Sequence, residues 1–264
     1  MEQYKRKTIR PGVTLLYGFQ EECCIYAVEG EKALALIDTG MGKGDLPGTL
    51  EVHAPGKRVI VFNTHCHFDH SAGNWQFPEV YMHPGCFRDQ DETEAMPDSG
   101  RPFARRVPVK EGDTFDLGGV RLEVCETPGH TPGDICLLDR AHRLLFAGDL
   151  IGSDAHNVWM LRRLPWVEFS TVSLECWLRS LEKVEALGEA YDGFLCGHDD
   201  HVLGKEFLRE LMRLGHAVVG GTARPVRPDI PSPPGQPPVV CWQVKGEGVP
   251  TALLYQEENI CDEK

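Results

Sequence analysis

The segment Asn63-Thr64-His65-Cys66-His67-Phe68-Asp69-His70 places three imidazoles and one carboxylate within six residues. Isolated histidines are common in cores and on surfaces. Imidazoles and carboxylates clustered at this density are instead typical ligands of zinc and other borderline divalent cations. The segment directly follows the apolar run 58–62, which the pattern predicts to be a buried strand. It therefore predicts a metal centre in a loop at the end of a strand.

Three further candidate ligands lie downstream, each following a predicted strand of its own. They are His130 after residues 120–125, Asp149 after residues 144–146 and His198 after residues 193–196. Functional side chains of α/β proteins gather in loops at one edge of a rigid sheet. We therefore expect these loops to meet at one centre. Gly129, Gly148 and Gly197 each precede a ligand directly and suit close approach of the backbone.

The remaining pattern predicts a mixed α/β protein with more strands than helices. Apolar runs bounded by Gly, Asp and Pro predict strands over residues 24–28, 33–37, 58–62, 120–125, 135–138, 144–146 and 193–196. Apolar stripes predict helices over residues 168–187 and 205–214. Residues 239–244 and 252–255 are expected to form a closing pair of strands. Residues 90–106, 152–165 and the proline-rich 222–238 are expected to be loops.

Length and composition favour a single domain, and the protein is expected to be cytoplasmic. The 264 residues are expected to form a single domain, 1–264, with a C-terminal extension after the proline-rich segment. The net charge of −13 argues against nucleic acid and anionic membranes as partners. No apolar run reaches the roughly 20 residues of a membrane span. The basic start lacks the apolar stretch of a signal peptide, so most of the ten cysteines are expected to be reduced core residues.

The chain resembles the metallo-β-lactamase-fold superfamily of hydrolases, whose signature HxHxDH appears here as residues 65–70. The resemblance extends over roughly residues 25–198 and includes Leu36-Ile37-Asp38-Thr39-Gly40, a strand ending in an Asp that supports the site. It implies a four-layer αββα sandwich. It also implies a first metal site of His65, His67 and His130, a second of Asp69, His70 and His198, and Asp149 as the bridge.

Two divalent ions, zinc or alternatively iron or manganese, would then activate a shared water for attack. Asp149 and Asp69 are the implied catalytic residues, Asp149 as the bridge and Asp69 as a handler of the proton. A closed structural zinc site would instead be four-coordinate and often contain thiolates. Cys66 lies between two stronger ligands and is expected to be structural.

Among the branches of the superfamily, the glyoxalase II-like and acyl thioesterase-like branch fits best. True β-lactamases of this fold have Cys or Ser where this chain has Asp149, and lactonases usually have a Tyr shortly after it, where this chain reads Leu150-Ile151-Gly152. The expected substrate is therefore a small thioester or related ester. A lactonase, a β-lactam hydrolase, a mononuclear iron persulfide dioxygenase and a non-catalytic binding protein remain the alternatives.

The substrate is expected to enter between the segments 90–106 and 152–166, because long irregular segments often form binding loops. Trp159 and Trp166 would give apolar surface for an acyl chain, and Arg162 would meet an anionic carrier. In the alternative interpretation, the tryptophans only pack this loop onto the body of the protein.

Overall fold

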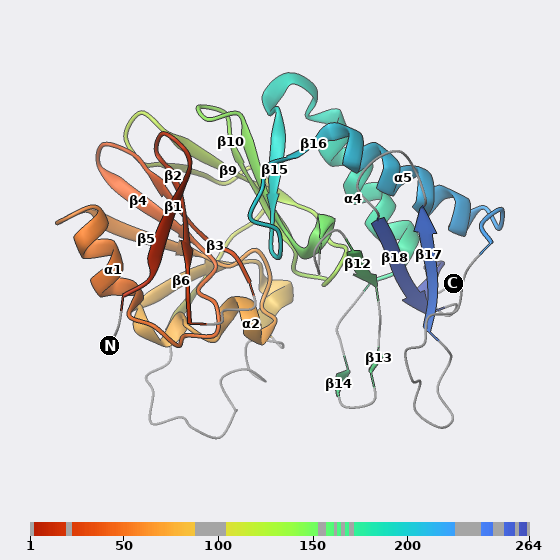
Figure 1. The fold of residues 1–264 in the computed structure, drawn as a ribbon, viewed down its shortest axis with the longest axis horizontal. Helices are drawn as coiled ribbons and strands as arrows, with labels where there is room; N and C mark the ends of the chain where they lie inside the picture. The colour runs from red at the N-terminus through yellow and green to blue at the C-terminus, as the bar shows by residue number, and fades with distance from the viewer. Residues whose placement is uncertain are drawn as a thin grey trace.

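Two β-sheets lie face to face between helices in the computed structural model of the chain (Figure 1). The structure describes residues 3–19, 23–87, 104–152, 157–160, 163–164, 167–168, 172–224, 239–244, 251–256 and 259–262. The first sheet has the order β1 (Lys5–Arg10), β2 (Val13–Tyr17), β3 (Ile25–Glu29), β4 (Ala33–Ile37), β5 (Arg58–Phe62), β6 (Glu79–Met82) and β7 (Arg105–Pro108). The second has the order β16 (Leu203–Gly204), β15 (Gly193–Cys196), β11 (Leu144–Gly148), β10 (Ile135–Asp139), β9 (Arg121–Glu126) and β8 (Thr114–Asp116).

Helices cover the outer face of each sheet. Helix α1 (Leu46–His53) packs on the first sheet, and α4 (Leu174–Ala186) and α5 (Lys205–Val219) pack on the second. The short elements are α2 (Phe68–Ser71), η1 (Asn74–Gln76), η2 (Pro84–Cys86), η3 (Asp149–Ile151) and η4 (Gly188–Ala190). The predicted four-layer αββα sandwich is thus confirmed. Among the described residues, no helix combines the length and the apolar character needed to cross a membrane.

Alternation along the strands explains the layers. In β4, Ala35 and Ile37 face the core between the sheets, whereas Leu34 and Leu36 face the core under α1. In β11, Leu144 and Phe146 likewise belong to the core between the sheets. Successive side chains of a strand point to opposite faces, so a strand covered on both faces is apolar throughout. This explains why the central strands are continuous apolar runs in the sequence.

A smaller, three-stranded sheet lies beside α4 and α5 (Figure 1). β18 (Thr251–Gln256) pairs antiparallel with β17 (Val239–Val244) and parallel with β12 (Asn157–Met160). The short strands β13 (Arg163–Leu164) and β14 (Val167–Glu168) pair with each other. The predicted closing pair of strands is therefore confirmed. The predicted loop over 152–165 is partly wrong, because β12 becomes a strand by pairing with β18, a partner distant in sequence.

The predicted helix over 168–187 is also corrected. β14 occupies Val167–Glu168, and α4 begins only at Leu174, where the hydroxyl of Ser173 accepts a hydrogen bond from the Cys176 amide. This N-cap fixes the start of the helix. Helix α5 ends later than the predicted 214, because Val218 continues its buried stripe. Most of the predicted loops 90–106 and 222–238 lies outside the described residues; Arg105 and Arg106 begin β7.

Parallel pairing aligns the strand ends that carry the candidate ligands. β4 runs parallel to β5, and β11 runs parallel to β15. Their carboxyl ends therefore share one edge of each sheet. The amide of Ile135 donates a hydrogen bond to the carbonyl of Thr64 at 2.9 Å and joins the two sheets at this edge.

Candidate metal centre

The first group of donors comes from both sheets. His65 and His67 follow β5, and His130 lies in the turn between β9 and β10. One ring nitrogen from each of the three lies within 4.8 Å of the others. The Nδ1 atom of His67 and the Nε2 atom of His130 are 2.9 Å apart. These are the three residues that the family resemblance assigns to a first metal site.

A second group lies beside it. Asp69, His70 and His198 also bring their donor atoms within 4.8 Å of one another. The Nε2 atoms of His70 and His198 are 3.3 Å apart, and Asp69 Oδ2 lies 3.4 Å from His198 Nε2. The structure thus brings together donors from the loops after β5 and β15.

The carboxylate of Asp149 lies between the two groups. Its Oδ1 atom is 3.2 Å from His70 Nε2, and its Oδ2 atom is 3.3 Å from His198 Nε2 and 3.5 Å from His130 Nε2. Asp149 begins η3 directly after β11 and is buried. One carboxylate therefore contacts ligand candidates of both groups, as a bridging ligand would.

The donor set fits divalent metal ions. Tetrahedral zinc with bonds of about 2.0–2.1 Å to nitrogen and oxygen separates its ligand atoms by roughly 3.3 Å. The separations of 3.2–3.5 Å around Asp149 are close to this value. The Nε2 atom of His65 is buried and meets no hydrogen-bond partner within the described part of the chain. Burying such an atom is costly unless it binds something, and a metal ion would satisfy it.

Burial and charge prepare the side chains for a cation. Burial lowers the pKa of His65 and of His67 well below the ordinary value, so both rings are neutral and can ligate. Burial also acts to lower the pKa of His70, but Asp149, Asp69 and Asp38 outweigh it and raise that pKa well above the usual range. The Asp149 carboxyl has its pKa held well below the usual range, because His198 and His70 outweigh the effect of burial. The centre therefore favours positive charge beside its carboxylates.

Asp38 holds His70 from behind, at the position that the sequence indicated. Its Oδ2 atom accepts from His70 Nδ1 at 2.9 Å, and its Oδ1 atom accepts from the Thr64 amide at 2.8 Å. Because Nδ1 of His70 donates to Asp38, the Nε2 atom of His70 faces Asp149 and His198. Partners of this kind fix the tautomer and orientation of metal-binding histidines.

A polar network behind the centre was missed by sequence reasoning. The Thr39 amide and the Asn63 side-chain amide both donate to the carbonyl of His70, at 2.8 and 3.2 Å. Asn74 joins them by donating to Asn63 Oδ1 at 2.7 Å and accepting from the Thr39 hydroxyl at 2.8 Å. The polar residues Asn63 and Asn74, which flank the ligand cluster in the sequence, could have indicated this network. Their mutual contacts depend on the tertiary fold.

Glycines allow the loops to approach closely. A Cβ atom on Gly197 would lie 2.1 Å from Asp149 Oδ1 and 2.7 Å from a ring carbon of His70. Gly148 has φ +50°, and a Cβ atom there would lie 2.5 Å from the Thr64 hydroxyl. Any side chain at either position would therefore push the ligand loops apart.

The other candidate residues lie away from the donor groups or outside the description. Cys66 is buried and its thiol contacts the sulfur of Met82, which agrees with a structural role. Trp159 lies in β12, but its side chain, Arg162 and Trp166 lie outside the described residues. Their assignment to a substrate site stays a prediction.

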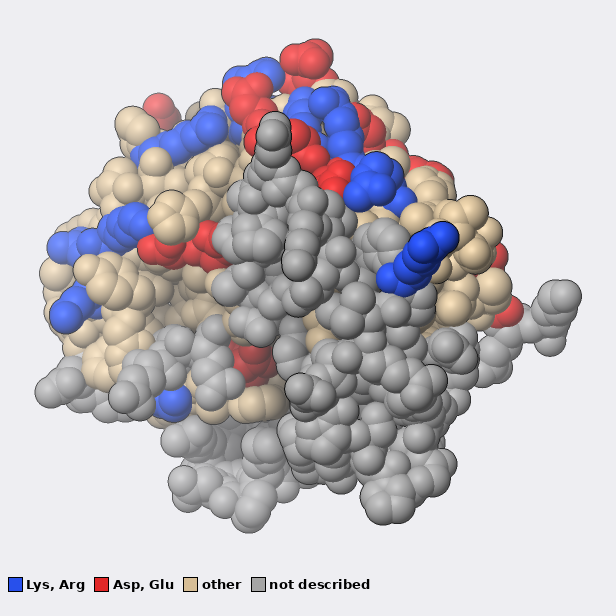
Figure 2. All heavy atoms as spheres, turned by 45° about the vertical axis from the view of Figure 1, so that its right-hand side comes forward, with Lys and Arg blue, Asp and Glu red and all other residues tan. Residues whose placement is uncertain are grey.

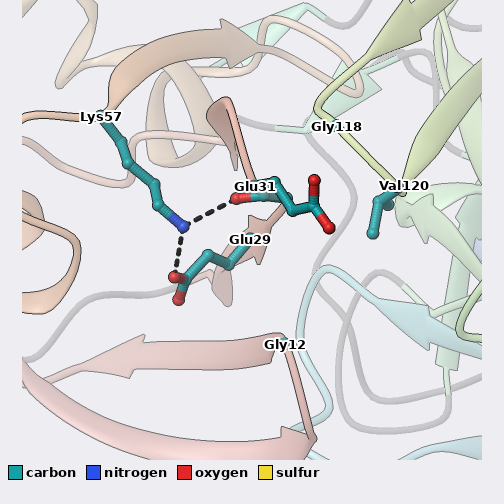
Figure 3. A pocket seen from close by; sticks show the side chains of 8 residues that line it. Gly12, Glu29, Glu31, Lys57, Gly118 and Val120 are labelled. Carbon is teal, nitrogen blue, oxygen red and sulfur yellow. Dashed lines mark hydrogen bonds and ion pairs between the residues drawn. The ribbon is translucent and has the colours of Figure 1, made fainter.

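Two other features of the described surface contain charges of both signs. A hollow of about 490 Å³ lies at the opposite end of β4, beside Glu29, Glu31 and Lys57 (Figure 3). The ammonium of Lys57 is already held there by Glu29 at 2.5 Å and by the carbonyl of Gly30 at 2.7 Å. On the face shown in Figure 2, acidic and basic side chains are interleaved, and its described part has no continuous basic patch.

Comparison with known proteins agrees with this geometry. The profile of the metallo-beta-lactamase superfamily matches residues 22–219, a span that includes all seven candidate ligands. The chain belongs to the metallo-beta-lactamase superfamily. An acyl-coenzyme A thioesterase MBLAC2 of Gallus gallus is 30% identical over 182 residues, which are 58% of this chain and 64% of that protein.

A hydroxyacylglutathione hydrolase of Synechococcus sp. is 32% identical over 117 residues, which are 44% of this chain and 43% of that protein. This chain therefore spans less than two thirds of the length of either relative. A metallo-beta-lactamase family protein of Thermus thermophilus superposes with a TM-score of 0.57 at 22% identity, over 81% of this chain and 82% of that one. The structural likeness shows the fold, and the two relatives are named as a thioesterase and as a hydrolase.

Proposed function

We propose that this protein is a metal-dependent hydrolase of acyl thioesters, with acyl-coenzyme A as the substrate class. The observation that carries the proposal is the convergence of seven nitrogen and oxygen donors from four strand-end loops, with Asp149 between the two groups. The similarity to an acyl-coenzyme A thioesterase supports the choice of substrate class. The alternatives from the sequence become outcomes of the test below.

Two zinc ions are the cofactors that we propose, because imidazole and carboxylate side chains are common ligands of zinc. His65, His67 and His130 would hold the first ion, and Asp69, His70 and His198 the second. Asp149 would bind both. When bound, such ions lower the pKa of water toward neutrality and polarise the carbonyl under attack.

We propose different roles for the carboxylates around the centre. Asp149 keeps only 5% of its side-chain surface exposed, whereas Asp69 keeps 15%. We assign to the more accessible Asp69 the transfer of a proton during attack. Asp38 and the network around the His70 carbonyl hold the ligand cluster rigid, so that little reorganisation is needed during the reaction.

Metal analysis and a substrate panel test this proposal. Purified protein should contain about two equivalents of zinc, as the bridging position of Asp149 predicts. It should hydrolyse acyl-coenzyme A faster than an acyl-glutathione, a lactone, a β-lactam or a phosphodiester. His130→Ala should lose metal and activity together, while His83→Ala, which changes a histidine outside the donor groups, should keep both.

Several outcomes would contradict the proposal. If protein loaded in excess zinc retained only a trace of metal, the proposed metal centre would be wrong. Hydrolysis of a lactone or β-lactam without thioester cleavage would change the substrate class. Production of sulfite from a persulfide by an iron-loaded form would place the chain among the dioxygenases.

A further inference from the structure

The hydroxyl of Tyr26 contacts the loop that carries His198. Tyr26 lies in β3 of the first sheet, whereas this loop, residues 196–199, lies at the end of β15 in the second sheet. The hydroxyl oxygen is 3.1 Å from the carbonyl oxygen of Cys196 and 3.0 Å from that of Asp199. One hydroxyl from the first sheet therefore contacts the residues on both sides of Gly197 and His198.

A backbone contact beside this hydroxyl joins the same two parts of the chain. The amide of Cys24, just before β3, donates to the carbonyl of Gly197 at 2.6 Å. The amide of Gly197 in turn donates to the carbonyl of Gly148 at 2.8 Å. Strand β16 pairs with β15 at Gly193 and Phe194, before the loop begins. The start of β3 is therefore the part of the first sheet that holds the loop 196–199.

Burial keeps the hydroxyl in this place. Tyr26 is 3% exposed and belongs to the core between the two sheets. Its ring centroid lies 5.6 Å from that of Phe146 in β11. Cys196 is fully buried, and Asp199 is buried as well. Buried phenols usually find a hydrogen-bond partner, and a buried carbonyl that loses its donor is costly. Removal of the hydroxyl should therefore loosen the loop.

The loop 196–199 sets the place of His198 in the second donor group. The Nε2 atom of His198 is 3.3 Å from His70 Nε2 and 3.4 Å from Asp69 Oδ2. The donors of the first group lie in other loops, after β5 and between β9 and β10; they are His65, His67 and His130. Loss of the Tyr26 hydroxyl should therefore act on the second group and not on the first.

We propose that Tyr26 is a positioning residue for His198, because its hydroxyl holds the loop 196–199 in the shape that the second donor group requires. Residues that orient a metal ligand change metal affinity without binding the ion themselves. The inference goes beyond the proposed hydrolysis and rests on the proposed function in one respect, the binding of a metal ion by Asp69, His70 and His198. A merely structural tyrosine would lower stability without favouring one metal site over the other.

Tyr26→Phe in the full-length protein is the main test, because it removes the hydroxyl and keeps the ring against Phe146. Metal-free parent and variant are titrated with zinc by calorimetry, and His198→Ala identifies the binding step that belongs to the second site. In Tyr26→Phe, the affinity of that step should fall about tenfold. The other step should stay unchanged. Amide hydrogen exchange over residues 196–199 of the metal-free protein should become faster.

Tyr191→Phe is the matched control. Tyr191 is also fully buried, and its hydroxyl donates to the carbonyl of Val184 at 3.3 Å, in the core that includes α4 and α5. The control should lower stability but leave both zinc affinities and the exchange of residues 196–199 as in the parent. If Tyr26→Phe folds only with metal, both variants are purified with zinc and unloaded with a chelator. The second-site ion of Tyr26→Phe should then leave at about tenfold lower chelator concentration.

An unchanged zinc affinity of the second site in Tyr26→Phe would overturn the inference, as would an equal loss at both sites or the same loss in Tyr191→Phe. If the parent bound zinc but cleaved no thioester, the proposed function would fail, and the titration would still decide the inference. If the parent bound no zinc, hydrogen exchange would decide it. Faster exchange of residues 196–199 in Tyr26→Phe alone would support the inference, and exchange equal to that of the parent would overturn it.

Discussion

Asp38 illustrates how a strained residue can support the arrangement of the centre. Its φ of +62° lies in the left-handed region, which costs a non-glycine residue roughly 1–2 kcal/mol. Three hydrogen bonds to its carboxylate, from Thr64 and His70, hold it there. Strain of this kind persists when the surroundings over-determine it, and it often marks functional sites. The carboxylate of Asp38 is therefore worth testing by itself.

Asp38→Asn should weaken the proposed second metal site. If the amide nitrogen of the new side chain faces His70 Nδ1, it donates where the carboxylate accepted, and the ring proton moves to Nε2, which can then no longer bind metal. We expect metal affinity or activity to fall about 10- to 100-fold. Elemental analysis and kcat/KM are the measurements, with Asp45→Asn at the N-cap of α1 as the control. Full metal content and activity in Asp38→Asn would contradict this role.

Asp134 supplies a prediction about pH. Its carboxylate accepts from the Thr131 amide at 3.0 Å, and burial raises its pKa from 3.8 to about 8. The folded protein therefore binds this proton more tightly than the unfolded chain does. The resulting stability is complete below the unfolded pKa and is lost as pH rises through about 8.

Between the ordinary pKa of 3.8 and the folded pKa of about 8, the parent should lose up to about 1.4 kcal/mol of stability per pH unit relative to Asp134→Asn. Urea unfolding of both proteins from pH 5 to pH 8, in roughly unit steps, measures this difference. If the free energies of unfolding of the two proteins changed in parallel with pH, Asp134 would already be charged at the lower pH.

At the scale of elements, α4 supports the loop that carries His130. The hydroxyl of Ser180 donates to the carbonyl of Pro128 at 2.7 Å. Trp177 packs where a side chain on Gly129 would lie, since a Cβ atom there would be 2.8 Å from the indole. The start of α4 is fixed by Ser173, which contacts both the Cys176 amide and Asp262. The helix thus joins the C-terminal segment to a ligand loop.

Ser173→Ala should lower the free energy of unfolding by about 1 kcal/mol, because it removes an N-cap hydrogen bond. Chemical denaturation measures the change, and Thr222→Ala, an exposed hydroxyl after α5, is the control. A Ser173→Ala protein as stable as the parent would mean that Asp262 or water caps the helix equally well.

At the scale of the whole molecule, the candidate ligand groups lie between the two sheets and draw on both. The loop after β5 belongs to the first sheet, while the loops carrying His130, Asp149 and His198 belong to the second. A ligand that binds only the folded state stabilises it by mass action, by about 2.7 kcal/mol at a hundredfold excess over Kd. Bound metal should therefore stabilise the packing of the two sheets against each other.

Removal of metal with a chelator should lower Tm by several degrees, and added zinc should restore it. Differential scanning calorimetry measures the change, with His130→Ala as the control that should respond less. An unchanged Tm after verified removal of metal would show that the sheets do not depend on the centre.

The sequence by itself determined the features that depend on local pattern. Strands buried on both faces are continuous apolar runs, so residues 33–37, 58–62 and 193–196 were predicted with their observed bounds. The candidate ligands were identified because imidazole and carboxylate side chains have a specific chemistry and lay in loops that follow predicted strands. Parallel strands then place their carboxyl ends at one edge, which is why the predicted convergence agrees with the structure.

Only the tertiary structure decided the features whose partners are distant along the chain. β12 was predicted as a loop because its four residues carry no strong local signal, and it is extended only through β18, nearly a hundred residues later. The network of Thr39, Asn63 and Asn74 likewise depends on packing between separate loops. Local propensity cannot encode such contacts, because their free energy comes from partners that are adjacent only in the folded chain.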